Sequence, residues 1–224
     1  MPDKSRSNNP ESESQPDIEH AAGNVAENAA KSADKIRQIK RAQRNTLSAS
    51  IQLQHSIDLQ QLTAQLNAYK NSNHIACYIA NDGEIDPVKI IEHAWSHDKK
   101  VYLPVLSPSK NSLYFAPYTE NSVCKMNRFG IPEPECKPSQ LIKAHQLDLL
   151  LLPLVAFDAS GNRVGMGGGF YDRTLAYLQD QQLLEIPELV GLAHEIQKVD
   201  RLNRQSWDIP LDYIITEKQH YQAR

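Results

Sequence analysis

The chain has 224 residues, of which 40% are hydrophobic and 23% charged, and its formal net charge is −3. These values fit one soluble globular domain and give no general reason to expect nucleic acid or an anionic membrane as a partner. The three cysteines are scattered and form no C-x-x-C pair, which argues against a disulfide framework or a cysteine zinc site.

The longest apolar run, residues 149–157, is far shorter than the roughly 20 residues of a membrane span. The N-terminus also lacks the apolar core of a signal peptide. We therefore expect a cytoplasmic protein that acts on its own as a monomer, without a membrane.

Residues 1–30 are polar and acidic, with few large apolar side chains to offset the entropy of ordering. This segment contains six acidic residues and two basic ones: Asp3, Glu11, Glu13, Asp17, Glu19 and Glu27, and Lys4 and Arg6. We expect 1–30 to be a disordered tail and 31–224 to form the folded domain.

A first helix is predicted from about Ala33, followed by a second over residues 53–70. Four basic residues of the first helix, at spacings of three and four, share one face: Arg37, Lys40, Arg41 and Arg44. A basic face on a helix is often only solvated, but a line of cations also suits a polyphosphate.

Strands and helices then alternate along the chain. Strands are expected at 74–80, 100–105, 113–116, 123–126, 149–152, 189–193 and 211–216, and helices at 87–97, 141–145 and 170–179. Near-continuous apolar strands between helices predict a three-layer α/β fold in one domain, with a largely parallel twisted sheet and helices on both faces.

A glycine-rich segment follows the strand at 149–152. Of nine glycines in the protein, five lie within nine residues: Gly161, Gly165, Gly167, Gly168 and Gly169. In a parallel sheet this place, between a strand and the next helix, is where ligands bind. Successive N–H groups without side chains can converge on an anion, so the segment predicts a phosphate-binding loop.

The segment matches neither of the common phosphate loops. It lacks G-x-x-x-x-G-K-[ST], and G-x-G-x-x-G fails because Phe170 occupies the last glycine position. Two interpretations stay open: an anion site, or glycines that only allow a strand and a helix to pack closely. Asp172, in the first turn of the next helix, could hold Mg²⁺ against phosphates, or simply complement the helix N-terminus.

Residues 151–173, read as L-L-P-L-V-A-F-D-x-x-G-N-R-V-G-M-G-G-G-F-Y-D-R, resemble the signature of the 5-formyltetrahydrofolate cyclo-ligase family, also called methenyltetrahydrofolate synthetases. Four other stretches agree in order, at 35–44, 82–86, 129–134 and 207–212. The resemblance spans about residues 33–218. It implies ATP-dependent closure of 5-formyltetrahydrofolate to 5,10-methenyltetrahydrofolate, with ADP and phosphate as the other products, and with Mg²⁺.

The resemblance also implies which residues form the site. The ATP-binding residues would be Lys35, Arg37, Arg41, Arg163, Val164, Gly165, Met166, Gly167, Gly168, Gly169, Phe170 and Tyr171. The residues binding the reduced folate would be Ile79, Glu84, Phe129, Met166, Gly167, Gly168, Gly169 and Phe170. Arg163 and Asp172 would be catalytic, and Asp172 and Asp208 would bind the metal.

Two positions depart from the family pattern. A lysine that the family often places four residues before the helix arginine is Ala33 here, so Lys31 or Lys35 must replace it. Phe170 stands where a tyrosine is common, which removes one hydroxyl. Glu84 and Asp208 also have plain alternatives as turn residues.

Other functions are less well supported. His93 and His97 have the i, i+4 spacing of metal ligands, but no third ligand is near in sequence, so an ordinary helix surface is expected. A phosphate-binding module without catalysis and a small-metabolite kinase remain the alternatives to the cyclo-ligase.

Overall fold

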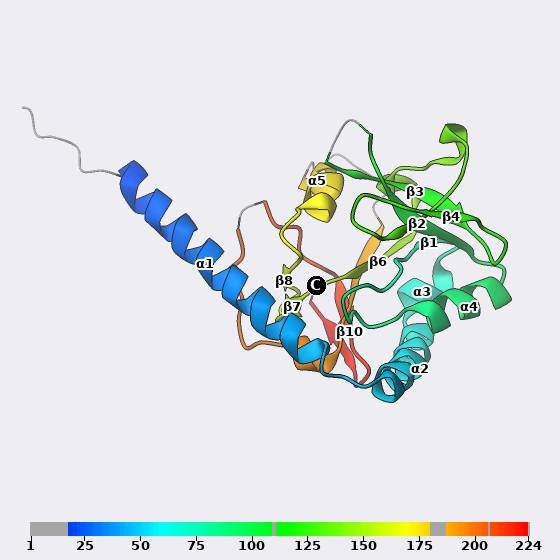
Figure 1. The fold of residues 1–224 in the computed structure, drawn as a ribbon, viewed down its shortest axis with the longest axis horizontal. Helices are drawn as coiled ribbons and strands as arrows, with labels where there is room; N and C mark the ends of the chain where they lie inside the picture. Colours follow the sequence, from blue (N-terminus) through cyan, green and yellow to red (C-terminus); the bar gives the residue numbers. More distant parts are fainter. Residues whose placement is uncertain (1–17, 109–110, 180–186, 206, 224) are drawn as a thin grey trace, which may run out of the picture.

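The computed structural model describes residues 18–108, 111–179, 187–205 and 207–223. Its helices are α1 (Ile18–Arg44), α2 (Ala49–Gln65), α3 (Asn67–Asn71), α4 (Val88–Ser96) and α5 (Phe170–Leu175). The strands are β1 (His74–Ala76), β2 (Lys100–Leu106), β3 (Leu113–Tyr118), β4 (Cys124–Met126), β5 (Pro132–Pro134), β6 (Leu149–Pro153), β7 (Ala156–Phe157), β8 (Arg163–Val164), β9 (Glu188–Leu192), β10 (Tyr213–Ile215) and β11 (His220–Gln222). Figure 1 shows their arrangement.

The main sheet has seven strands in the order β11-β10-β9-β6-β1-β2-β3. The five inner strands are parallel, and the two edge strands, β3 and β11, each pair antiparallel with their neighbour. The α/β class and the largely parallel sheet expected from the sequence are confirmed.

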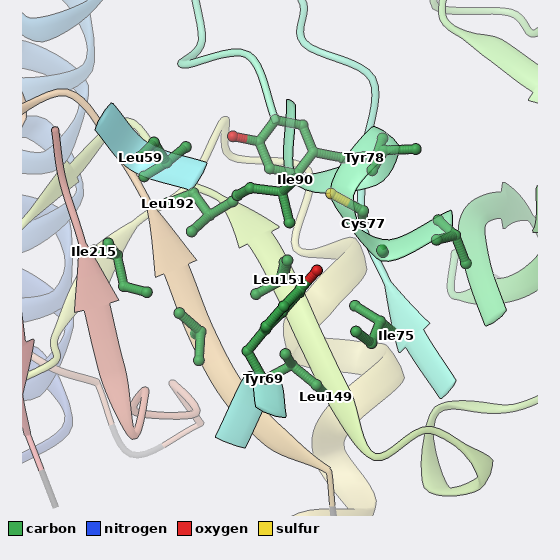
Figure 2. Close-up of a cluster of buried hydrophobic side chains, with 14 of the residues drawn as sticks. Leu59, Tyr69, Ile75, Cys77, Tyr78, Ile90, Leu149, Leu151, Leu192 and Ile215 are labelled. Carbon is green, nitrogen blue, oxygen red and sulfur yellow. The ribbon is translucent and has the colours of Figure 1, made fainter. Parts of the chain in front are cut away.

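Strand β6 shows how the sequence builds the layers. Its four leucines are all fully buried, and alternate ones face opposite sides of the sheet because successive strand residues point to opposite faces. Leu149 and Leu151 join the core under α2, α3 and α4, which Figure 2 shows. Leu150 and Leu152 join a second core on the other face, covered by α5 and short 3₁₀ turns.

The parallel strands occur along the chain as β1, β2, β6, β9 and β10 but lie side by side as β2-β1-β6-β9-β10. Their order therefore reverses between β1 and β6. In open α/β sheets such a reversal leaves a crevice beyond the carboxyl ends of the two strands, where ligands bind. The segments that leave β1 and β6 are residues 77–87 and 154–169.

The N-terminal helix differs from the expectation. α1 begins at Ile18, well before Ala33, so 18–30 is helical rather than part of a disordered tail. Alanine has the highest helix propensity, but it was not counted among the large apolar residues that form a core. Residues 18–30 contain five alanines: Ala21, Ala22, Ala26, Ala29 and Ala30. The remainder of the expected tail, 1–17, lies outside the described residues. No helix that the structure describes is both long enough and apolar enough to cross a bilayer.

Several other boundaries were wrong. The single helix expected over 53–70 is divided into α2 and α3 at Leu66, whose backbone is extended. The helix expected at 141–145 is absent from this described segment: Ile142 pairs with Phe115, and Ala144–Gln146 forms only a 3₁₀ turn. The β7–β8 hairpin and β11 were not predicted, because runs of two or three residues are too short for a periodic signal.

Candidate functional site at the β1–β6 switch point

The candidate site lies where the segments after β1 and β6 meet the C-terminal half of α1. Figure 1 shows this end of α1 beside the β7–β8 hairpin, and the two elements are in contact. Three parts of the chain that are distant in sequence therefore converge on the crevice predicted by the strand order.

The glycine segment connects β8 to α5. Gly167 has a φ of +92° and Gly169 a φ of +60°, conformations that favour glycine. Two arginines bind its carbonyl groups: Arg37 Nε donates to Gly165 O at 2.8 Å, and Arg173 donates to Gly168 O. The segment is thus fixed to α1 on one side and to α5 on the other.

The amide groups of this segment are left available. Within the described part of the chain, the N–H groups of residues 165–170 donate to no protein acceptor, and residues 165–168 are exposed. Exposed, unengaged N–H groups on a fixed backbone suit an anion. α5 is shorter than the helix expected at 170–179, since it ends at Leu175 and continues as a 3₁₀ turn, so its dipole adds little.

Arg44 is the structural centre of the site, and it is completely buried. Its guanidinium donates to Asp82 O at 2.7 Å, to Asp82 Oδ2 at 3.1 Å and to Leu154 O at 3.4 Å. These bonds connect α1 to the segments that follow both β1 and β6. The sequence placed Arg44 on a basic face but gave no sign that it would be buried.

The rest of the basic face is also engaged with the protein. Arg37 Nη1 pairs with Asp34 at 2.5 Å, and Arg41 Nε pairs with Asp82 at 2.6 Å. Lys40 donates to the carbonyl groups of Ile196 and Lys198. The face therefore holds loops in place and is not a free line of cations. Lys35, also predicted here, is exposed on α1.

Glu84 is a nearly buried carboxyl group on the segment after β1, with only 11% of its side chain exposed. Burial raises its pKa to about 7, against the opposing effect of Arg44, whose Nη2 lies 3.9 Å from Glu84 Oε1. Its other oxygen accepts the Asn81 N–H at 3.1 Å. Glu84 thus titrates near neutrality.

Tyr171, which directly follows the glycine segment and Phe170, lies close enough to Glu84 to feel its charge. Its pKa is raised well above the usual range, mainly by burial and also by the nearby Glu84. Tyr78, on the segment after β1, has a raised pKa for the same two reasons, and its hydroxyl donates to Ile85 O at 2.8 Å. Both phenols are therefore neutral groups near Glu84.

Aromatic and apolar side chains lie on the exposed side. Phe129 and Phe170 meet edge to face with ring centroids 5.7 Å apart, so two residues 41 positions apart in sequence form one surface. Phe129 and Met166 are half exposed, although they are large apolar side chains. Ile79 packs against the first core at the edge of the segment after β1.

Arg163 and Asp172 form an ion pair at 2.6 Å, with Arg163 nearly buried and Asp172 one-third exposed. Arg163 also donates to Ile209 O and, with Asp208, lines a small cavity. Asp208 Oδ2 accepts the Gln205 N–H at 2.8 Å, as in a turn. Of the two aspartates predicted as metal ligands, Asp172 is therefore paired with Arg163 and Asp208 lines the same small cavity as Arg163. Val164 precedes the glycine segment in β8.

A sequence profile of the 5-formyltetrahydrofolate cyclo-ligase family matches residues 29–217. The chain belongs to the 5-formyltetrahydrofolate cyclo-ligase family. It is 41% identical to the 5-formyltetrahydrofolate cyclo-ligase of Haemophilus influenzae over 169 residues, which cover 75% of this chain and 88% of the relative. It is 44% identical to that of Escherichia coli over 143 residues, covering 63% of this chain and 76% of the relative.

A solved structure agrees with these cyclo-ligase relatives. The 5,10-methenyltetrahydrofolate synthetase of Aquifex aeolicus superposes with a TM-score of 0.71 at 28% identity, covering 86% of this chain and 93% of that one. The family and the enzyme class predicted from the glycine segment are confirmed. The roles of individual residues remain predictions.

Proposed function

We propose that this cyclo-ligase converts 5-formyltetrahydrofolate to 5,10-methenyltetrahydrofolate and that the reaction consumes ATP, whose γ-phosphoryl group is transferred to the substrate and released as phosphate, leaving ADP. The observation that carries the proposal is one juxtaposition. The unengaged N–H groups of residues 165–170 directly precede Tyr171, which lies close enough to Glu84 for that carboxyl group to raise its pKa. The names of the relatives agree with this substrate and product.

The chemistry explains why a nucleotide is needed. A formamide carbon is a poor electrophile, and its oxygen is a poor leaving group. Transfer of the γ-phosphoryl group to the formyl oxygen releases ADP and leaves an iminium phosphate. N10 of the folate then attacks the formyl carbon, phosphate leaves with the formyl oxygen, and N10 loses its proton. Such a reaction requires positioning and charge stabilisation more than a covalent nucleophile.

The glycine segment would hold the nucleotide. The N–H groups of residues 165–170 would donate to phosphate oxygens, while Arg37 and Arg173 bind the carbonyl groups of Gly165 and Gly168. Arg37 and Arg41 would add positive charge from α1, and Arg163 would do so from β8. Tyr171 and Phe170, at the start of α5, would hold this segment against the crevice.

Magnesium fits the carboxylates at this site in part. Asp172 Oδ1 is bound by Arg163 and Asp208 Oδ2 by Gln205 N, whereas the other oxygen of each has no protein partner in the described part of the chain. Mg²⁺ prefers one or two carboxylates together with phosphate oxygens, which is the donor set that Asp172, Asp208 and a nucleotide would offer. When bound, the ion would neutralise charge that develops on the transferring phosphoryl group.

Reduced folate would lie between the two segments. A pterin presents an amide N–H and an exocyclic amine side by side, and Glu84 could accept both in its ionised form. Phe129, Phe170 and Met166 would contact the flat rings, and Ile79 would contact the pterin edge. The formyl group would then lie near the glycine segment, where the phosphoryl group must reach it.

The test uses purified full-length protein with 5-formyltetrahydrofolate and Mg·ATP. Methenyl product is followed by its near-ultraviolet absorbance and phosphate by a coupled assay, with reactions lacking ATP or folate as controls. We expect equal rates of both signals, each dependent on ATP. A stable phosphorylated product without free phosphate would indicate a kinase instead, and nucleotide binding without turnover would indicate a binding module.

A further inference from the structure

A surface of two aromatic rings and two arginines borders the glycine segment. Phe129, from the loop between β4 and β5, and Phe170, from the start of α5, meet edge to face at 5.7 Å. The guanidinium carbon of Arg128 lies over the Phe129 ring, 5.0 Å from its centre. The guanidinium carbon of Arg173 lies over the Phe170 ring, 5.4 Å from its centre. Two parts of the chain that are distant in sequence therefore each supply one ring and one cation to the same surface.

This surface is continuous with the segment that would bind phosphate. A Cβ added to Gly168 would lie 2.9 Å from the Phe170 ring. A Cβ added to Gly169 would lie 2.7 Å from Arg173 Nη1. The ring and the guanidinium therefore lie directly against the last two glycines of the segment, where a residue with a side chain would collide with them.

Both arginines keep donors available for a ligand. Arg173 Nε donates to Asn111 O at 2.6 Å and Nη2 donates to Gly168 O, whereas Nη1 donates to no acceptor in the described part of the chain. Arg128 is exposed and has no hydrogen-bond partner among the residues that the structure describes. Neither arginine forms an ion pair with a carboxylate of those residues, unlike Arg37, Arg41 and Arg163. Two positive charges on this surface are therefore left without a counter-charge.

The chemistry of the surface indicates which ligand it fits. An arginine stacked on an exposed ring is common on protein surfaces, and alone it indicates no ligand. Two such pairs in contact, beside a proposed phosphoryl-transfer site, suit a molecule in which an aryl group is joined to carboxylates. Aromatic rings contact an aryl group by stacking or edge to face, and the planar guanidinium of arginine binds a carboxylate through two N–H groups.

We propose that Arg128 and Arg173 bind the glutamyl carboxylates of the reduced folate, an assignment that rests on the proposed function. N10 of the substrate carries the benzoyl ring, and an amide joins that ring to the glutamyl group. Because N10 must reach the formyl carbon beside the glycine segment, the benzoyl ring lies next to that segment and the carboxylates lie farther out. Phe129 and Phe170 would contact the benzoyl ring and the arginines its charged end. The two arginines thereby determine specificity without touching the reacting atoms.

The test compares two ligands that differ only in the glutamyl group, 5-formyltetrahydrofolate and 5-formyltetrahydropteroate. Their dissociation constants are measured by titration calorimetry with the full-length protein, so the result does not depend on turnover. We expect the wild type to bind the glutamylated ligand about tenfold more tightly, since each solvent-exposed ion pair contributes a factor of about three. The preference should fall about threefold in Arg128→Gln and in Arg173→Gln. Any effect of Arg173→Gln on the glycine segment is common to both ligands and cancels in the ratio.

Lys125→Gln is the matched control, because it removes one exposed positive charge from β4 and should keep the full preference. Added salt should reduce the preference of the wild type, since the ion pairs are exposed. Equal affinities of the wild type for the two ligands would overturn the proposal, as would a preference that neither arginine variant lowers. An equal fall in Lys125→Gln would also overturn it, by assigning the effect to net charge. The expected preference without formation of methenyl product would support the carboxylate site and contradict the proposed function alone.

Discussion

Replacing Glu84 with glutamine removes a carboxyl group that the fold holds at a raised pKa. The pKa is about 7 in the folded chain and 4.5 in the ordinary unfolded environment. As pH rises from 4.5 to 7, the unfolded chain gives up the proton first, so ionisation favours unfolding in this range. Stability contributed by the protonated group is therefore fully present below pH 4.5 and is lost as pH rises through 7.

The size of this effect follows from the difference of about 2.5 pKa units, at 1.36 kcal/mol for each, which gives about 3 kcal/mol. The figure needs little correction for solvent, because only 11% of the side chain is exposed. We expect the free energy of unfolding of the wild type to fall by about 3 kcal/mol between about pH 4.5 and about pH 8 because of this group. Glu84→Gln should not show this fall.

The assay is urea unfolding of both proteins across this pH range, with the difference in unfolding free energy plotted against pH. Other titrating groups are common to the two proteins and cancel in the difference. Glu133→Gln is the matched control, since Glu133 lies on β5, outside the surroundings of Glu84 and Arg44. If the difference for Glu84→Gln did not change with pH, the assignment of a buried carboxyl group with a raised pKa would be refuted.

Four further predictions concern the rest of the site. Arg37→Ala should raise KM for ATP about tenfold, because a charge-assisted hydrogen bond to the glycine segment is lost. Gln38→Ala, on the exposed side of α1, is the control and should leave KM unchanged. If Arg37→Ala and the wild type have equal KM values, Arg37 is not part of the site. Arg44→Met should lower the free energy of unfolding by about 3 kcal/mol because buried acceptors lose their partner, and a loss below about 1 kcal/mol would contradict this. Asp172→Asn should lower turnover in a way that excess Mg²⁺ partly restores; wild-type kinetics would exclude a metal role. Deleting residues 1–30 should leave turnover intact, and a large fall would make that segment part of the site.

The sequence predicted the fold best where long apolar periodicity dominates. The run of buried leucines in β6 and the apolar pattern of α4 predicted the ends of both elements to within one residue. Prediction failed where pairing or propensity acts without such a pattern. β11 and the strands of the β7–β8 hairpin have only two or three residues each, too few for a periodic signal, and the start of α1 depends on the helix propensity of alanines.

The site was predicted in its parts but not in its connections. Glycine clustering pointed to residues 165–169 as a candidate anion-binding segment, and the family resemblance pointed to Glu84 and Phe129 as candidate folate-binding residues. Neither could show that Arg44 is buried between two loops, because an arginine at helical spacing has the same sequence signal whether it is solvated or enclosed. Arg173 was missed for the same reason, since its bond to Gly168 depends on how α5 folds back.

The transfer of the γ-phosphoryl group to the formyl oxygen is the central claim, and isotope labelling tests it most directly. 5-Formyltetrahydrofolate carrying ¹⁸O in the formyl group is converted by the enzyme with Mg·ATP, and the released phosphate is analysed by mass spectrometry. Because the phosphate leaves with the formyl oxygen, we predict that one ¹⁸O appears in each phosphate formed. Label found in water, with phosphate unlabelled, would contradict the mechanism.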